Sequence, residues 1–160
     1  MSSRRIKAVC GFMFSADRRK VALIRKNRPN FQAGKLNGIG GKAERGELNS
    51  LRVAMVREFR EETSMVTHEG DWLLYARILT PGWDVRFYRA FGFDLTQLQS
   101  LTDELIEIHN VSTLNFQNTM RNVQWLVPLA LDNSEYVLPH VFRETEPLPK
   151  LLPSVGGTSA

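Results

Sequence analysis

The segment from Gly40 to Met65, GGKAERGELNSLRVAMVREFREETSM, constrains this chain more than any other. It joins a glycine-containing loop to a run that is typical of an amphipathic helix. Glu58, Glu61 and Glu62 stand near the end of that helix, and like charges three or four residues apart on a helix repel one another. They also oppose the helix macrodipole, which favours cations at a helix C-terminus. A divalent cation is the simplest compensating partner, and a solvated acidic face is the alternative.

The side chains of this segment are of the kind that a hard cation binds. The spacing of Glu58, Glu61 and Glu62 points their carboxylates to one place beside the helix. Mg²⁺ and Mn²⁺ prefer oxygen ligands, and Mg²⁺ commonly bridges to substrate phosphates. The carbonyl of Gly40 can join these ligands because glycine allows close approach, and Arg57 can hold one carboxylate in place. The segment therefore predicts a metal-dependent, phosphate-handling loop and helix.

Strands and helices are predicted on both sides of this segment from hydrophobic periodicity and turn residues. The predicted strands are residues 6–14, 21–26, 71–80, 85–95 and 105–109, with a short edge strand at 138–142 that contains Pro139. One helix is predicted over 51–63, capped by Asn49 or Ser50. A second opens at Asn118 or Thr119 and is kinked or stopped early by Pro128. This order predicts a single α/β domain over residues 1–150, followed by a flexible tail at 151–160.

Composition limits the class of protein. A chain of 160 residues suits one domain with a sizeable core. The single cysteine, Cys10, excludes an intramolecular disulfide, fits a reducing cytoplasm and is expected to be a buried structural thiol. No apolar stretch is long enough to span a membrane. The net charge of +4 suits a phosphate-bearing ligand, and there is no basic run or motif that favours long nucleic acid. We expect a cytoplasmic monomer or homodimer without a membrane partner.

The central segment resembles the box of the Nudix hydrolases, G-x5-E-x7-REU-x-EE-x-G-U, in which U is an apolar residue. The chain supplies Gly41, Glu47 and then REFREETSM from Arg57 to Met65. Two features differ: nine residues rather than seven separate Glu47 from Arg57, and Ser64 stands where the box has glycine. The longer spacing keeps the REFREE register but can move Glu47. At Ser64 we expect strain or a different helix cap.

A second stretch, KLNGIGGKAERGE, is similar to the MutT-like and oxidised-purine-nucleotide branch of that family, in which WNGFGGK is a recognisable variant. The resemblance runs from Lys7 to about Leu131 and implies a Nudix-type α/β/α sandwich with a mixed central sheet. It places Asn37 where the animal enzymes of the branch contact the base. It places His109 where those enzymes have a stacking tryptophan.

The resemblance implies that water attacks a phosphorus of a nucleoside diphosphate linked to another group. The implied reaction is Mg²⁺-dependent (or Mn²⁺-dependent) hydrolysis of a nucleoside triphosphate, such as an oxidised purine dNTP, to the monophosphate and pyrophosphate. The implied catalytic residues are Glu58, Glu61, Arg57 and Glu47, and the implied metal ligands are Gly40, Glu58, Glu61 and Glu62. The expected substrate contacts are Asn37, Lys42 and His109, with Phe31 and Trp83 as stacking candidates from a loop and a turn.

Some alternatives stay open. A glutamate outside the box can act as the general base, and Glu104 and Glu107 are the candidates, although both can equally be solvated acids. Phosphate charge can also be met by Arg28 or Arg86. The substrate can instead be ADP-ribose, a nucleotide sugar, a dinucleoside polyphosphate or a capped RNA end. A non-catalytic nucleotide sensor is the remaining alternative, prompted by the insertion and by Ser64.

Overall fold

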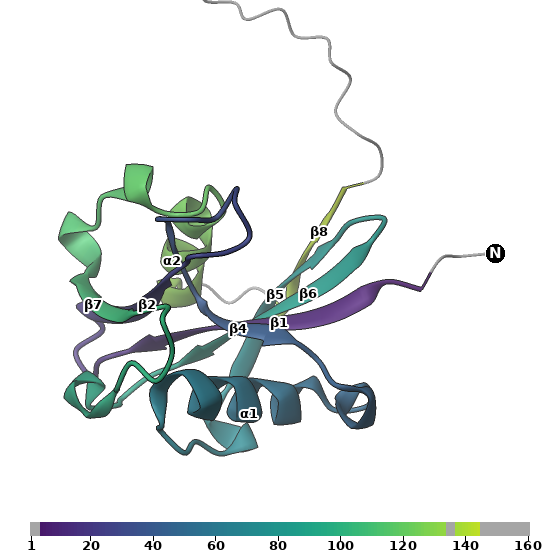
Figure 1. Cartoon of the computed structure of the whole chain (residues 1–160), viewed down its shortest axis with the longest axis horizontal. Coiled ribbons are helices and arrows are strands. Elements are labelled where there is room, and N and C mark those ends of the chain that lie inside the picture. Colours follow the sequence, from purple (N-terminus) through teal and green to yellow (C-terminus); the bar gives the residue numbers. More distant parts are fainter. Residues whose placement is uncertain (1–3, 134–136, 145–160) are drawn as a thin grey trace, which may run out of the picture.

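The computed structural model describes residues 4–133 and 137–144. Within them eight strands and two α-helices form a mixed sheet with a helix on each face (Figure 1). The strands are β1 (Ile6–Phe14), β2 (Lys20–Arg25), β3 (Leu36–Asn37), β4 (Ile39–Lys42), β5 (Leu73–Leu79), β6 (Trp83–Ala90), β7 (Ile106–Asn110) and β8 (His140–Arg143). The helices are α1 (Leu51–Thr63) and α2 (Val123–Leu131). The predicted α/β sandwich with a mixed central sheet is confirmed. The predicted tail at 151–160 lies outside the described residues.

Strand β1 is the centre of the sheet. It pairs in parallel with β6 along almost its whole length, from Ile6 opposite Trp83 to Met13 opposite Ala90. On its other edge β1 pairs with β4 at its beginning and with β2 at its end, both antiparallel. Strand β2 then diverges to pair with β3 and β7, while β5 joins β6 to the edge strand β8. The space left by the divergence of β2 is where β4 enters the sheet.

Side chains of β1 alternate between two cores, which explains why its sequence is apolar throughout. Val9 and Met13 belong to the core beneath α1, whereas Cys10, Phe12 and Phe14 belong to the core beneath α2. Burial raises the pKa of the Cys10 thiol to about 12, so the expectation of a buried structural thiol is confirmed.

Close approach of α1 to the sheet depends on Gly11. A Cβ atom at this position would lie 2.6 Å from the Met55 methyl group and 2.8 Å from the Trp72 ring. A larger residue would therefore push the helix away from β1. This packing fixes the height of α1, and with it the position of every side chain that the helix presents to β4.

Helix α1 has the predicted bounds, with Ser50 as its N-cap residue. Its end is formed by Ser64, which has a φ of 66° and donates its backbone N–H to the Arg60 carbonyl at 2.9 Å. Glycine adopts this left-handed conformation without the steric penalty that a Cβ atom brings. The expected strained cap is therefore present, and serine takes the conformation in which the box has glycine.

Replacing Ser64 with glycine is expected to raise the free energy of unfolding by about 1 kcal/mol, because it relieves the left-handed strain. Urea unfolding of both proteins measures the change. Ser64→Ala is the matched control: it keeps the Cβ atom and should leave the stability close to that of the wild type. A glycine variant that is less stable than wild type would show that the greater freedom of the unfolded chain outweighs the strain.

Two strand predictions needed correction at their ends. Strand β5 begins at Leu73 rather than residue 71, because Glu69–Asp71 form a 3₁₀ turn in which Asp71 accepts the backbone N–H of His68. Strand β6 begins at Trp83 rather than residue 85, so Trp83 lies in the strand and not in a turn. It ends at Ala90 rather than residue 95, because Gly92 turns the chain with a φ of 87°. The edge position predicted for the last strand is confirmed, since β8 pairs with β5 alone among the described strands.

The second helix was predicted to start too early, and of the two effects expected of Pro128 an early stop does not occur. Phe116–Asn118 form a separate 3₁₀ turn capped by the Asn115 side chain, so α2 starts at Val123. The helix then runs past Pro128 to Leu131. Its apolar face, including Val127, is buried against the sheet, and this tertiary packing outweighs the helix-breaking effect of proline.

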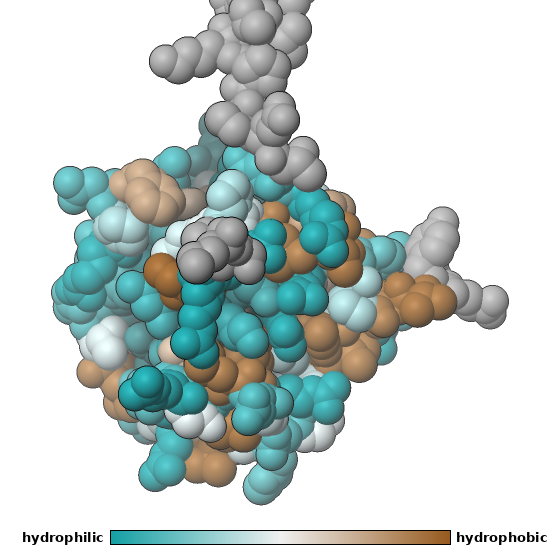
Figure 2. Space-filling model, turned by 90° about the vertical axis from the view of Figure 1, so that its right-hand side faces the viewer, coloured by the Kyte–Doolittle hydropathy of each residue, from teal (hydrophilic) through white to brown (hydrophobic). Residues whose placement is uncertain are grey.

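Neither described helix is long and apolar enough to cross a membrane. Exposed apolar side chains, including Trp83, Val141 and Phe142, occur singly or in small groups. On the face seen in Figure 2, hydrophobic areas are separated by hydrophilic ones.

An ion pair on the sheet stabilises the beginning of β6. Arg77 of β5 donates two hydrogen bonds, of 2.8 and 2.7 Å, to the buried carboxylate of Asp84. Burial alone would raise the pKa of Asp84, but Arg77, with help from Arg86 and Lys7, lowers it below its ordinary value. The folded protein therefore holds the Asp84 proton less tightly than the unfolded chain does. The pair stabilises the fold fully above the unfolded pKa, and this contribution is lost as the pH falls through the folded pKa.

Asp84→Asn is expected to lower the free energy of unfolding at neutral pH by about 2–3 kcal/mol. The gap between variant and wild type should begin to narrow below about pH 4, where Asp84 of the unfolded chain takes up its proton, and should close as the pH falls through the lower pKa of the folded protein. Urea unfolding across this pH range measures the gap. Asp103→Asn, which breaks the exposed pair with Arg28, is the control and should have only a small effect. A gap that stays constant with pH would show that Asp84 acts through packing and not through charge.

Candidate functional site

Arg57 is the centre of the candidate site. Its guanidinium donates from Nε and Nη2 to the two Glu47 oxygens, both at 2.9 Å. Glu47 is buried and also accepts the backbone N–H of Glu44 at 2.8 Å. Arg57 and the Glu44 backbone lower the pKa of Glu47, although burial opposes them. The two extra residues between Glu47 and Arg57 therefore do not separate these side chains.

The same guanidinium orients the acidic end of α1. Its Nη1 donates to Glu58 at 3.0 Å and to Glu61 at 3.1 Å, and its Nη2 donates to the Lys42 carbonyl at 3.1 Å. One arginine thus ties the box glutamate, two helix carboxylates and the end of β4 together. A planar fork with five N–H donors can do this, whereas a lysine ammonium cannot match the geometry.

Glu58 packs directly onto the backbone of β4. A Cβ atom at Gly41 would lie 2.6–2.8 Å from its carboxylate group, so only glycine leaves the space that Glu58 occupies. Burial raises the pKa of Glu58, the nearby charges of Glu61 and Glu62 raise it further, and Arg57 opposes both effects. Keeping the Glu58 carboxylate ionised in this position is therefore unfavourable in free energy, and a bound cation would relieve that cost.

Glu61 and Glu62 complete the acidic face of α1 in different ways. Glu61 is largely exposed apart from its contact with Arg57. Glu62 accepts a hydrogen bond from the Thr102 hydroxyl at 3.2 Å, and burial raises its pKa. In the part of the chain that the structure describes, no three acidic, histidine or cysteine side chains form a ready-made metal cage. Oxygen donors with unfavourable like charges nonetheless suit Mg²⁺, which takes few protein ligands and shares the rest with water and phosphate.

The two glutamates outside the box have different surroundings. Glu104 is buried, accepts from Lys26 Nζ at 2.9 Å and from the Asn27 backbone at 2.6 Å, and lies close enough to Glu62 to raise its pKa. Thr102 links the two acids, since its hydroxyl bonds Glu62 and accepts the Glu104 backbone N–H at 3.1 Å. Thr102 belongs to no recognisable motif, so the sequence did not predict its link between Glu62 and Glu104.

Glu107 lies on β7 with different partners. It forms a two-point ion pair with Arg25 and bonds His109 Nε2 at 3.0 Å. The hydrogen bonds from Arg25 lower the pKa of Glu107 most, and the bond to His109 lowers it further, whereas burial opposes both. Of the two candidates, only Glu104 lies near the carboxylates of α1.

The candidate substrate contacts are not gathered in one place. Asn37 on β3 and His109 on β7 lie on opposite edges of β2, since Ile24 pairs with Asn37 on one edge and with Ile106 of β7 on the other. The Asn37 side-chain oxygen accepts the backbone N–H of Gly38 at 2.8 Å, which leaves its amide group for another partner. Phe31 projects from the loop that joins β2 to β3 and is 67% exposed.

Trp83 and Lys42 lie at the other end of the sheet. Trp83 pairs in register with Ile6 at the beginning of β1, and Lys42 Nζ lies 5.6 Å from the centre of its ring. The structure therefore does not bring Trp83 together with Asn37 or His109. A stacking role for Trp83 would concern a group other than the base that Asn37 is expected to contact.

Residues 4–118 match the family described as the NUDIX domain, which covers most of the chain. The chain belongs to the Nudix family. The Nudix box thus corresponds to the loop, glycine strand and acidic helix described above. The match places the chain among the Nudix hydrolases and leaves its substrate open.

Solved structures with the same fold include several Nudix proteins at low identity. A MutT studied from Aliivibrio salmonicida and Vibrio cholerae has a TM-score of 0.64 at 22% identity, over 80% of this chain and 98% of that one. The NUDIX domain of Shewanella oneidensis NrtR, solved with ADP ribose, has a TM-score of 0.63 at 18% identity, over 81% and 88%. A MutT/nudix family protein from Enterococcus faecalis has a TM-score of 0.60 at 23% identity, over 69% of this chain and 45% of that chain. No curated protein matches the sequence significantly.

The two glycines of the Nudix box are expected to respond differently to alanine. Gly41→Ala should fold with little loss of stability, because the group it displaces is the flexible end of Glu58. Its Nudix activity should fall by about 10²-fold, since a misplaced catalytic group costs that much. Gly40→Ala should lose several kcal/mol of stability, because its Cβ would lie 1.9 Å from the Val9 carbonyl, which is backbone. Thermal unfolding and turnover measure both, and equal stability losses would contradict the assignment of Glu58 to the space above Gly41.

Proposed function

We propose that this Nudix protein hydrolyses a nucleoside triphosphate to the monophosphate and pyrophosphate with Mg²⁺ or Mn²⁺, an oxidised or non-standard purine dNTP being the first candidate. The observation that carries the proposal is the set of α1 carboxylates held by Arg57 over the backbone of β4. Such a set gives phosphate-bound cations oxygen ligands on one side and leaves the other side open to substrate.

The Gly40 carbonyl with Glu58, Glu61 and Glu62 would hold the metal. When bound, Mg²⁺ neutralises charge on the phosphates and lowers the pKa of a bound water. Arg57 and Glu47 position the carboxylates and do not need to touch the substrate. Lys42, on the strand that carries the two box glycines, would meet phosphate charge. Asn37 and His109 would contact the base from β3 and β7, the strands on either side of β2.

The proton of the attacking water needs an acceptor within hydrogen-bonding reach. Glu58 and Glu61 in the box are two candidates, and Glu104 is the third because Thr102 links it to Glu62. Lys26 and the Asn27 backbone hold Glu104 ionised, since they lower its pKa against the effect of burial. Glu107 is committed to Arg25 and is a poorer candidate.

The proposal is tested by incubating the purified protein with each NTP and dNTP, and with an oxidised guanine nucleotide. The same panel includes ADP-ribose, nucleotide sugars, dinucleoside polyphosphates and capped RNA. Reactions run with Mg²⁺, with Mn²⁺ and with a chelator, and the products are separated to show which anhydride bond is cut. Turnover of a triphosphate that requires metal and yields pyrophosphate supports the proposal. Turnover only of another substrate, or of none, overturns it.

A non-catalytic sensor is the competing function. It was prompted by the insertion after Glu47 and by Ser64, and both are accommodated without disturbing Arg57 or the end of α1. Replacing Glu61 and Glu62 together with glutamine separates the two functions. Nucleotide binding by a sensor should survive the change, whereas turnover by an enzyme should be abolished.

A further inference from the structure

Glu62 differs from the other two carboxylates of the acidic face in the group that holds it. Arg57 Nη1 donates to Glu58 at 3.0 Å and to Glu61 at 3.1 Å. Glu62 instead accepts the hydroxyl of Thr102 at 3.2 Å. In the part of the chain that the structure describes, no basic side chain lies within ion-pair distance of Glu62. Glu62 is therefore the carboxylate of this face that has a neutral partner.

A neutral donor acts on a carboxylate differently from a guanidinium. The positive charge of Arg57 orients Glu58 and Glu61, but it also offsets the negative charge that would attract a cation. A hydroxyl fixes the direction of a carboxylate and leaves its charge in place. Hydrogen bonds of this kind, from groups that do not touch the metal, orient metal-ligating carboxylates in proteins. Glu62 can therefore offer a cation a carboxylate that is both oriented and fully charged.

The segment 99–104, which carries Thr102, is anchored to the end of α1. The backbone N–H groups of Gln99 and Leu101 donate to the carbonyls of Thr63 and Glu62, at 3.0 and 3.4 Å. The last carbonyls of a helix have no partner within the helix itself, so the segment also completes the hydrogen bonding of α1. These bonds bring Thr102 next to a carboxylate that is 40 residues away along the chain.

The same segment is held on its other side by the loop that follows β2. Glu104 is only 5% exposed, and it accepts the Asn27 backbone N–H at 2.6 Å and Lys26 Nζ at 2.9 Å. Its own backbone N–H donates to the Thr102 hydroxyl oxygen at 3.1 Å. The hydroxyl proton then has two acceptors in reach, Glu62 at 3.2 Å and the Glu104 carbonyl at 3.3 Å. Thr102 is therefore fixed between α1 and this loop.

We propose that Thr102 is a positioning residue of the metal site, whose hydroxyl orients the Glu62 carboxylate toward a divalent cation without neutralising it. The proposal rests on the proposed function, in which Glu62 is one of the ligands of Mg²⁺ or Mn²⁺. Thr102 itself touches neither the cation nor the substrate. Arg57 and Thr102 thus divide the acidic face, since Arg57 holds Glu58 and Glu61 and Thr102 holds Glu62.

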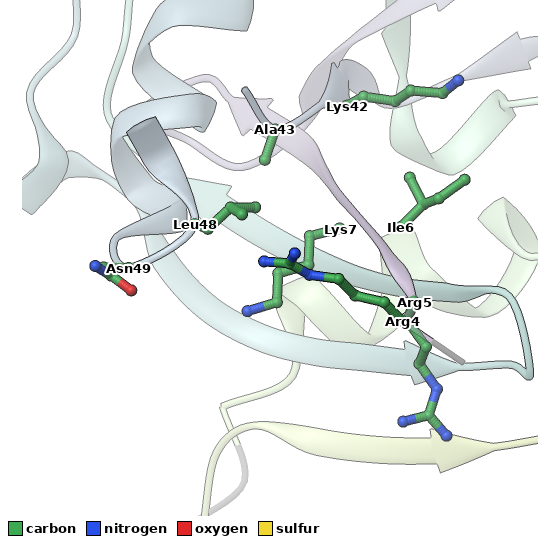
Figure 3. A pocket seen from close by; sticks show the side chains of 8 residues that line it. All are labelled: Arg4, Arg5, Ile6, Lys7, Lys42, Ala43, Leu48 and Asn49. Atoms are coloured by element: carbon green, nitrogen blue, oxygen red, sulfur yellow. The ribbon is translucent and has the colours of Figure 1, made fainter. Parts of the chain in front are cut away.

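A basic hollow beside the beginning of β1 does not compete for the cation. Four of its lining side chains are basic, those of Arg4, Arg5, Lys7 and Lys42, and none is acidic (Figure 3). Gathered positive charges repel a divalent cation. Binding of a cation to the protein without substrate therefore reports on acidic groups and not on this hollow.

Binding of Mn²⁺ to the substrate-free protein tests the role of Thr102 without relying on catalysis. The free Mn²⁺ is measured by electron paramagnetic resonance during a titration. Thr102→Val should raise the dissociation constant by about tenfold or more, because a partner that orients a ligand is lost. Thr102→Ser keeps the hydroxyl and should restore the dissociation constant to within about threefold of the wild-type value.

Thr96→Val is the matched control. Thr96 is also exposed and its hydroxyl also bonds a carboxylate, that of Asp94 at 2.6 Å, in a 3₁₀ turn before the segment 99–104. Its loss should change the Mn²⁺ dissociation constant by less than about twofold. An unchanged dissociation constant in Thr102→Val would overturn the role of Thr102 and leave the metal site standing. No binding of Mn²⁺ to the wild type would overturn the metal site, and the role of Thr102 with it.

A double-mutant cycle with Glu62→Gln separates positioning from support of the fold. If Thr102 acts through Glu62, Thr102→Val should change the Mn²⁺ dissociation constant of the Glu62→Gln protein by less than about twofold. An equal loss of affinity in both backgrounds would show that Thr102 only supports the segment 99–104, and would overturn the proposal. Thermal unfolding of each variant shows whether the fold is kept.

Kinetics with the substrate identified from the panel show which acid Thr102 serves. The Mg²⁺ concentration that gives half-maximal turnover should rise by about tenfold in Thr102→Val, while kcat at saturating Mg²⁺ stays within about threefold of wild type. The opposite pattern, a lower kcat with an unchanged Mg²⁺ requirement, would assign Thr102 to Glu104 and not to Glu62. That result would overturn the proposal even if Mg²⁺-dependent hydrolysis is found.

Discussion

Glu58→Gln is expected to reduce turnover by about 10²–10⁴-fold while leaving the fold intact. The carboxylate lies against Gly41 and is held by Arg57, where a glutamine fits the same space and can still accept from Nη1. The substitution removes a negative charge that burial and the neighbouring glutamates already disfavour. The free energy of unfolding in the absence of metal should therefore not fall. Steady-state kinetics with the substrate identified from the panel, together with thermal unfolding, measure the two effects.

Metal binding gives an independent readout of the same substitution. Mg²⁺ at about a hundredfold excess over its dissociation constant should stabilise the wild type by about 2–3 kcal/mol, because it binds the folded state alone. The Glu58→Gln variant should show a much smaller shift in unfolding temperature on addition of Mg²⁺. Glu69→Gln, an exposed acid outside α1, is the control and should keep the wild-type shift. An unchanged Mg²⁺ shift in the Glu58 variant would remove Glu58 from the metal site.

Much of the fold could be predicted because local pattern and tertiary contacts agree in the central elements. The bounds of β1 and α1 follow from their apolar period and, for α1, from the cap at Ser50. Elsewhere the outcome depends on contacts that no local pattern contains. Phe116–Asn118 form a turn of their own, and Pro128 is tolerated because the rest of α2 packs on the sheet.

The sequence predicted the residues of the candidate site that belong to a motif. It did not predict contacts that depend on the tertiary structure. The REFREE run located the acidic face of α1, and the glycines of the box implied a close approach. The number of residues after Glu47 could not say whether that side chain still meets Arg57, because a loop can lengthen without moving its ends. Thr102 and the basic hollow were not visible in the sequence, since their partners are distant along the chain.

Arg57→Met is expected to lower the free energy of unfolding by about 3–5 kcal/mol, because it leaves the buried Glu47 carboxylate without its partner. Turnover should also fall by about 10²-fold, since Glu58 and Glu61 lose the group that orients them. Arg57→Lys keeps the charge but lacks the planar fork, so both losses should be intermediate. Urea unfolding and steady-state kinetics measure the series.

A double-mutant cycle with Glu47→Gln separates the contribution of the Glu47 pair from the rest. If Arg57 stabilises the protein mainly through Glu47, the double variant should be more stable than the sum of the single changes predicts, by about 1–3 kcal/mol. Turnover should show no such recovery, because restoring neutrality at Glu47 does not return Glu58 and Glu61 to their positions. Recovery of turnover along with stability would mean that Arg57 acts on the carboxylates of α1 only by keeping the loop before the helix folded. Additive stability changes would mean that the bonds from Arg57 to Glu58 and to the Lys42 carbonyl, and not the buried pair, hold α1 against β4.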